Sequence, residues 1–267
     1  MELFDGTIKI TDKRNGPIGS SMAGYGAYTA WYCIPQEDSI TTVPTPGGRE
    51  GYAIKVIARP VVSACGSTNK DQHVQISAYI NGMPTTYKET WMGWSTMLDP
   101  SWQPQGPGGW EHFGMGLAII GYALPNTGLY TDIDLASTAI HVLNNARHSD
   151  GRYALSAAEH TKGVWHDWMF HVKWAKDNTG FLEFYHKTGT NPYKIVYSIY
   201  NVATLNPANP DNDFGARMGL YRGETSISTQ IFYTQGVKVG TMRVDVEYGG
   251  TVECPVPICN ITIGGAQ

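Results

Sequence analysis

The fold of this chain is constrained most by short segments in which aromatic and β-branched residues occupy every second position. The clearest segment is residues 165–174, where the alternating positions are Trp168, Phe170, Val172 and Trp174. Because successive side chains of a strand point to opposite faces of a sheet, this spacing predicts a strand with one apolar face. Similar segments follow, separated by Gly, Asn, Asp or Pro, at residues 180–185, 217–222 and 231–240. This pattern is typical of strands joined by turns.

The most regular alternation lies at His73–Ile80, where the even positions are all apolar and the odd positions are His73, Gln75, Ser77 and Tyr79. One face of such a strand packs on a core, while the other lines a groove or meets solvent. No long helical period occurs, so the sequence predicts an all-β fold: a jelly-roll sandwich of two antiparallel sheets with a concave, groove-bearing face. Further strands are predicted at residues 7–11, 28–34, 51–60, 91–98 and 241–248, with two more within 130–155.

Size and charge narrow the class of protein. The length of 267 residues suits one β-rich domain, which we expect to span residues 1–267 with a tail at 241–267. The net charge of −4 argues against a nucleic-acid partner, and an anionic polymer would need a local basic groove. No segment is apolar enough over a sufficient length to cross a membrane, and we expect a monomer.

Four cysteines allow two disulfide bonds or four free thiols. The pairing expected from sequence proximity is Cys254–Cys259, across a Pro-x-Pro turn, which leaves Cys33–Cys65. Oxidised pairs would indicate secretion, and a glycosylation sequon at Asn260 points the same way. Although the residues at the N-terminus do not resemble a signal peptide, the cysteines and the sequon lead us to expect a secreted protein. The cysteine pairing stays open.

Several of these segments resemble, in their order, the heparin lyase I-like polysaccharide lyases, and the fungal glucuronan lyases look like relatives. The shared features are Trp-x-x-Trp-x-Phe-x-Val-x-Trp from Trp165, a strand that begins at Gly180, Gly-Leu-Tyr-Arg from Gly219, and an aromatic strand that ends in Val-x-Val-Gly at Gly240. The resemblance covers residues 50–240. It implies a concanavalin A-like jelly roll whose concave groove holds an acidic polysaccharide.

The resemblance also implies site residues. His112 matches the histidine that is catalytic in the family, and Tyr221 lies in the Gly-Leu-Tyr-Arg motif. Arg217 stands where relatives carry Lys, while His73 and Gln75 replace the Arg and Glu of an Arg-x-Glu motif. This loss of fixed positive charge favours an unsulfated polyuronate, such as glucuronan, as the substrate. Further substrate-binding residues expected around the site are Trp110, Glu111, Lys173 and Arg222.

These residue types suffice for β-elimination at a uronate. The reaction removes the proton next to the carboxylate and protonates the glycosidic oxygen, while negative charge builds on the carboxylate. His112 suits the base near neutral pH, and Tyr221 can deliver the proton, or act as base if Arg217 lowers its pKa. Gln75 and His73 can hydrogen-bond or neutralise the carboxylate. The chemistry requires no metal or organic cofactor. Two aspartate pairs, Asp132 with Asp134 and Asp211 with Asp213, could each hold a structural calcium ion, and the alternative for them is a solvated strand edge.

Two other classes of protein remain open. A glycoside hydrolase on a similar sandwich would need paired carboxylates that flank the bond, for which Glu111 and Glu183 are the candidates. A non-catalytic carbohydrate-binding module would need neither. Only a lyase creates an unsaturated uronate, so ultraviolet absorbance of the product distinguishes the lyase from the other two classes.

Overall fold

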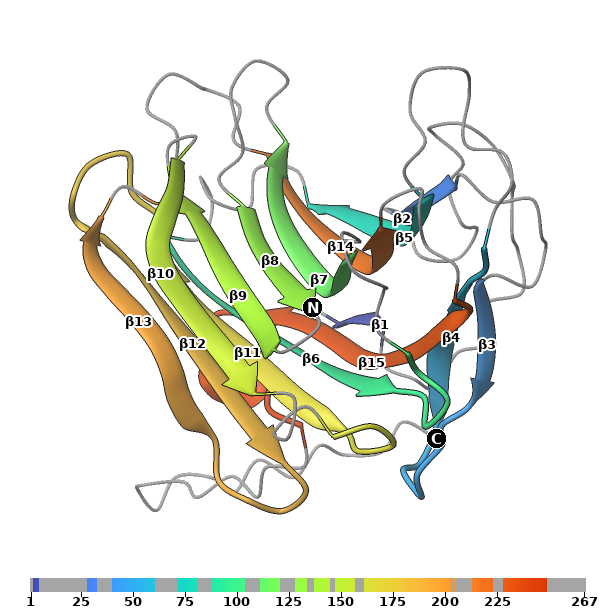
Figure 1. Cartoon of the computed structure of the whole chain (residues 1–267). Helices are drawn as coiled ribbons and strands as arrows, with labels where there is room; N and C mark the ends of the chain where they lie inside the picture. Colours follow the sequence, from blue (N-terminus) through green and yellow to red (C-terminus); the bar gives the residue numbers. More distant parts are fainter. Residues whose placement is uncertain are drawn as a thin grey trace, which may run out of the picture.

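A computed structural model of the chain describes residues 2–4, 28–32, 40–60, 72–80, 88–103, 111–120, 128–133, 137–144, 147–156, 161–202, 204, 213–222 and 228–248. This part of the chain consists of β-strands, their connections and one 3₁₀ helix, η1 (Arg243–Asp245). The strands form two sheets that lie in two layers (Figure 1).

The strands of the larger sheet are β1 (Glu2–Phe4), β3 (Ile40–Pro44), β4 (Tyr52–Ala58), β6 (Glu89–Leu98), β11 (His166–Lys173), β12 (Gly180–Thr188), β13 (Lys194–Val202) and β15 (Gln230–Gly240). Their order is β13-β12-β11-β6-β15-β4-β3, and β1 also pairs with β15. The strands of the smaller sheet are β2 (Tyr28–Tyr32), β5 (Gln72–Ile80), β7 (Glu111–Ile120), β8 (Gly128–Ile133), β9 (Ser137–Asn144), β10 (Arg147–Ser156) and β14 (Asp213–Arg222). Their order is β10-β9-β8-β7-β14-β5-β2.

In each sheet, a C-terminal strand lies between strands from the N-terminal half of the chain. β14 lies between β5 and β7, and β15 lies between β4 and β6, so the C-terminal strands are inserted between N-terminal ones. Every described strand pair is antiparallel. The predicted jelly-roll sandwich of antiparallel sheets is therefore confirmed, and strands that are remote in sequence can place their residues side by side.

Burial follows the predicted alternation of β11 only from Phe170 onward, because Met169 on the other face is fully buried as well. Trp168 and Phe170 are almost fully buried, and their rings pack on Phe184 of β12 with centroids 5.4 and 4.5 Å apart. Trp94 of β6 packs on Phe170 at 4.8 Å. These aromatic side chains are buried on the inner face of the eight-stranded sheet. Removal of their apolar surface from water is the dominant favourable contribution to folding.

The outer face of the same sheet is covered locally by two chain segments. Arg49, after β3, donates to both carboxylate oxygens of Asp167 on β11 at 2.8 and 2.9 Å, and Ser95 donates to the same carboxylate at 2.5 Å. The Arg49 guanidinium also lies over the rings of Trp165 and Tyr248, 4.9 and 4.1 Å from their centroids. The side chain of Asp167 is 1% exposed, so a buried ion pair ties the turn and the C-terminal segment to this face.

The prediction of a strand at residues 241–248 is wrong. This segment forms η1 and a turn that lie against the outer face, over Gly93 and Gly240. A side chain at Gly93 would collide with the Val246 carbonyl, and one at Gly240 would collide with Asp245. Because the segment lies flat on the sheet instead of at its edge, it has no strand to pair with.

The segment from residue 128 to 156 forms three strands, β8, β9 and β10, one more than predicted. The other predicted strands within the described residues are present with small shifts at their ends. Several predictions lie outside the described residues and stay predictions: the strand at 7–11, the sequon at Asn260 and the disulfide bonds of Cys33, Cys65, Cys254 and Cys259.

Candidate active site

Three neighbouring strands of the seven-stranded sheet bring predicted catalytic residues together. In the register of β14 with its neighbours, Tyr221 lies directly opposite His73 on β5 and directly opposite His112 on β7. Directly opposed residues of an antiparallel pair belong to the same face, with Cβ atoms typically about 4.5–5.5 Å apart. These three residues therefore form one row across the sheet, which we call the histidine–tyrosine row.

The remaining predicted residues of the central site occupy the next rows of the same face. Gly219 of β14 lies opposite Gln75, and Arg217 lies opposite Gly116 of β7. Residues two positions apart on a strand share a face, about 6.6–6.8 Å from each other. His73, Gln75, His112, Arg217 and Tyr221 thus lie within three adjacent rows of one face. We call it the polar face.

The opposite face of the seven-stranded sheet differs in composition. Its positions on the central strands are apolar, namely Val74 and Ile76 on β5, Phe113 and Met115 on β7, and Met218 and Leu220 on β14. In a two-layer sandwich the apolar faces pack against each other. The polar face is therefore the face directed away from the eight-stranded sheet.

Three residues expected at the site are not brought together with this group, and a fourth lies outside the described residues. Glu111 and Arg222 lie opposite each other, one position beyond His112 and Tyr221, and so belong to the opposite face of the sheet. Lys173 is on β11 in the other sheet, where it alternates with the buried residues of the inner face. Trp110 lies outside the described residues. We leave Glu111, Arg222 and Lys173 out of the site.

Four polar residues extend the polar face; the sequence singled out Asp132 only as a calcium candidate and did not indicate Tyr130, His141 or Arg152. Asp132 of β8 lies directly opposite His112, and Tyr130 lies two positions away on the same strand. Tyr130 lies opposite His141 of β9, which lies opposite Arg152 of β10. The sequence contained a signal, since Tyr130 and Asp132 occupy alternate positions of β8, but alternation does not show which strands are neighbours.

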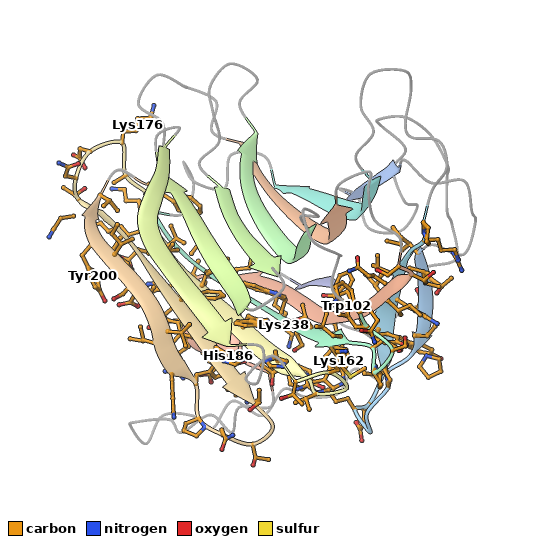
Figure 2. The ribbon with its side chains drawn as sticks, in the orientation of Figure 1. Trp102, Lys162, Lys176, His186, Tyr200 and Lys238 are labelled. Atoms are coloured by element: carbon orange, nitrogen blue, oxygen red, sulfur yellow. The ribbon has the colours of Figure 1, made fainter. Side chains whose placement is uncertain are left out.

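The outer face of the eight-stranded sheet carries a second group of titratable residues. Glu183 accepts hydrogen bonds from His171 Nδ1 at 3.0 Å, from Tyr185 at 2.7 Å and from Tyr200 at 2.5 Å. The His171 ring is stacked on Trp91 with centroids 4.0 Å apart. Figure 2 shows Tyr200 on β13, at the edge of the sheet, and this residue is 51% exposed. We call His171, Glu183, Tyr185 and Tyr200 the outer-face cluster.

The pKa shifts in the outer-face cluster keep Glu183 ionised and Tyr185 protonated. Partial burial raises the pKa of Glu183, but the hydrogen bonds from Tyr200, Tyr185 and His171 outweigh it and hold that pKa below its ordinary value. Burial and the Glu183 carboxylate raise the pKa of Tyr185. A tyrosine bonded to a carboxylate is a poor base, so this cluster is suited to holding the edge of the sheet together. Glu111 and Glu183 also belong to different sheets and cannot flank one glycosidic bond.

A hydrogen-bonded pair of histidines lies in the core. The Nδ1 of His166 and the Nε2 of His186 are hydrogen-bonded at 2.9 Å, and the His186 ring stacks on Trp168 at 4.2 Å. Burial lowers the pKa of His166 to about 4. This histidine is neutral at pH 7 and is part of the packed interior.

Among the residues whose side chains are described, no group of three or more His, Cys, Asp or Glu has the geometry to hold a metal ion. The side chains of Asp132, Asp134, Asp211 and Asp213 all lie outside this set, and the structural calcium ion stays a prediction. No described helix has the length and apolar character needed to span a bilayer.

Comparisons with known proteins agree with this architecture. The family model described as "Polysaccharide lyase" matches residues 21–238. A comparison with curated proteins gives no match.

Solved structures share the fold. The structure of an endo-β-1,4-glucuronan lyase from the fungus Trichoderma reesei is similar, with 21% identity, 80% of this chain and 92% of that chain covered, and a TM-score of 0.56. An alginate lyase from Aplysia kurodai has 11% identity over 83% of this chain and 93% of that chain, with a TM-score of 0.54. A β-glucanase catalytic domain from Podospora anserina has 13% identity over 91% and 96%, with a TM-score of 0.51.

Proposed function

This chain belongs to the polysaccharide lyase family, and from that premise we propose that it cleaves a uronic-acid-containing polysaccharide by β-elimination on the polar face of the seven-stranded sheet. The observation that carries the proposal is the histidine–tyrosine row. A tyrosine directly opposite a histidine on each side supplies an acid and a base within the span of one sugar ring and its glycosidic bond.

The roles follow from the chemistry of each side chain. His112 takes the proton next to the uronate carboxylate, and the electrons of that C–H bond form the new C=C bond. The C–O bond to the leaving sugar breaks, and the Tyr221 hydroxyl gives its proton to the departing oxygen. His112 then carries an extra proton and Tyr221 lacks one, so a transfer between these two neighbours restores the enzyme. Each atom is accounted for, and no co-reactant is needed.

Charge that develops on the carboxylate needs donors on the same face. Arg217 is a permanent cation two rows from Tyr221, and Gln75 occupies the row between them. His73 adds a donor beside Tyr221. Donors that are already in position when charge develops are usually the largest single contribution to such a reaction. The backbone carries no side chain at Gly114, Gly116 and Gly219, which favours close approach of a sugar at these positions.

The substrate class that fits these residues is an unsulfated polyuronate. Arg217 is the one fixed cation among the five residues of the central site, which matches one carboxylate per sugar better than a densely sulfated chain. Two of the similar structures are a glucuronan lyase and an alginate lyase, and both polymers consist of uronates. We propose glucuronan or a related polymer as the substrate, and secretion as the setting in which such a polymer is met.

A single screen tests this function. The purified protein is mixed separately with glucuronan, alginate, pectate, heparin and hyaluronan, and both ultraviolet absorbance and reducing ends are followed. A lyase raises both signals together on at least one polyuronate. Reducing ends without absorbance would indicate a hydrolase, and binding without either signal would indicate a carbohydrate-binding module; each result overturns the proposal.

A further inference from the structure

We propose that Tyr130, His141 and Arg152 form a second uronate-binding subsite on the polar face, remote from the bond that is cleaved. These three residues lie directly opposite one another on β8, β9 and β10, the last three strands of the seven-stranded sheet. The inference rests on the proposed function for the identity of the ligand, and it adds a site for a different sugar of the same polymer.

The face of this row follows from the register. His112 lies opposite Asp132, and on the other side of an irregularity in the pairing Ala118 lies opposite Gly128. Both pairs connect even-numbered positions of β7 with even-numbered positions of β8, so the irregularity does not exchange the two faces. Tyr130, between Asp132 and Gly128, therefore belongs to the same face as His112, and its partners His141 and Arg152 follow.

The residue types of the row suit an anionic sugar. Arg152 provides a permanent cation with planar donors that match a carboxylate, and His141 provides a further donor. Tyr130 combines an apolar ring with a polar hydroxyl, a combination suited to contact with a sugar. The neighbouring row on the same strands pairs Ala139 with Ala154, two residues with small side chains. The alternate positions next to these rows are Ile140, Val142, Tyr153 and Leu155, which suit the face that packs in the sandwich.

The separation of the two arginines indicates a polymeric ligand. β14 and β10 are four strand spacings apart in the order of the sheet, roughly 19 Å at the usual spacing of about 4.8 Å. One sugar ring cannot contact both Arg217 and Arg152. A polyuronate that lies across the strands carries a carboxylate on every residue and can therefore reach both cations at once.

The test is the dependence of Arg152→Ala on chain length. Kinetics are measured on uronate oligomers of increasing length and on the polymer. Loss of a charged hydrogen-bonding partner is expected to lower kcat/KM by roughly 10- to 100-fold on long substrates. The shortest oligomer that is cleaved is too short to reach β10, so its kcat/KM should be unchanged.

Arg147→Ala is the matched control, because it removes the same charge from the same strand at a position on the opposite face. It should show no dependence on length. If Arg152→Ala is folded and behaves like Arg147→Ala at every length, the subsite does not exist. If Arg152→Ala does not fold, as judged by thermal unfolding, His141→Ala in the neighbouring strand is put through the same series, with the same two outcomes.

A binding experiment separates this inference from the proposed function. Calorimetric titration of Tyr221→Phe with a long uronate oligomer requires no turnover, and adding Arg152→Ala to it should raise Kd by roughly 10- to 100-fold. An unchanged Kd overturns the subsite even if the protein is a lyase. If Arg152→Ala raises Kd in a protein that has no lyase activity, the subsite is supported although the proposed function fails.

Discussion

The polar face and the outer-face cluster use the same kinds of residue in opposite ways. In the outer-face cluster, Glu183 accepts hydrogen bonds from a histidine and two tyrosines, and Tyr185 is held in its protonated form. On the polar face, Tyr221 lies between two histidines, with Arg217 two rows away and glycines beside it. Residue type alone therefore does not distinguish a catalytic group from a structural one. A tyrosine that already donates its proton to a neighbouring carboxylate, as Tyr185 does to Glu183, is unsuited to proton transfer in catalysis.

The largest expected difference between the two regions concerns tyrosine hydroxyls. Tyr221→Phe keeps the ring and removes the acid, so kcat should fall by about 10²–10⁴-fold while KM changes little. Tyr200→Phe removes an exposed hydroxyl that bonds to Glu183, and kcat should be unchanged. Initial rates of absorbance increase measure both. Near-normal turnover in a folded Tyr221→Phe would mean that the site has been placed wrongly.

Histidines offer a second matched pair. His112→Asn retains some hydrogen bonding but removes the base, so we expect a loss in kcat of about 10²–10⁴-fold. His171→Asn breaks the bond to Glu183 and should lower the free energy of unfolding by about 1 kcal/mol with normal kcat. The comparison fails if His171→Asn is the variant that loses turnover.

On the outer face, the largest effect should be on stability. Arg49→Ala leaves the Asp167 carboxylate buried without its cation, which should lower the free energy of unfolding by about 3–5 kcal/mol. The control is Arg243→Ala, since Arg243 is 47% exposed and pairs with Glu247 on the surface; exposed pairs contribute about 0–1 kcal/mol. Denaturant titration measures both. Equal effects would show that the buried pair does not hold the turn in place.

The buried His166 predicts a pH dependence of stability that is separate from the pH dependence of catalysis. Its pKa is about 4 in the folded protein and about 6.5 in an unfolded chain, so the unfolded state binds more protons between these values. Stability is complete above pH 6.5 and should fall by about 3 kcal/mol as the pH drops to 4. Unfolding free energies of the wild type and His166→Gln, measured from pH 7 to pH 4, test this. A slope that is the same in the variant would contradict it.

Arg217→Ala should lower turnover less than Tyr221→Phe or His112→Asn, and it should affect both substrate binding and the chemical step. A cation binds the uronate in the ground state and stabilises it further as charge develops, so we expect KM to rise and kcat to fall, with a combined loss of roughly 10- to 100-fold. An unchanged KM would remove Arg217 from the site.

Much of the fold was readable in the sequence because alternation is a local property. The period of two identified most strands, and it assigned Arg217, Gly219 and Tyr221 to one face. It predicted the apolar inner face of β11 but not the burial of Met169 on the outer face. The order of the aromatic segments indicated the family. Each of these inferences depends on residues within a few positions of one another, and strand geometry fixes their relation without knowledge of the rest of the chain.

Only the tertiary structure decided which strands are neighbours and in what register. Pairing of β14 with β5 and β7 is set by packing between distant segments, and a shift of one residue would exchange the faces. Alternation within a strand already places Glu111 and Arg222 on the face opposite to His112 and Tyr221. Without the register, however, Tyr130, His141 and Arg152 could not be recognised as a row. The C-terminal segment was likewise decided by long-range contact. Its own residues allow a strand, but it lies on the sheet over Gly93 and Gly240, where the missing side chains give it room to turn.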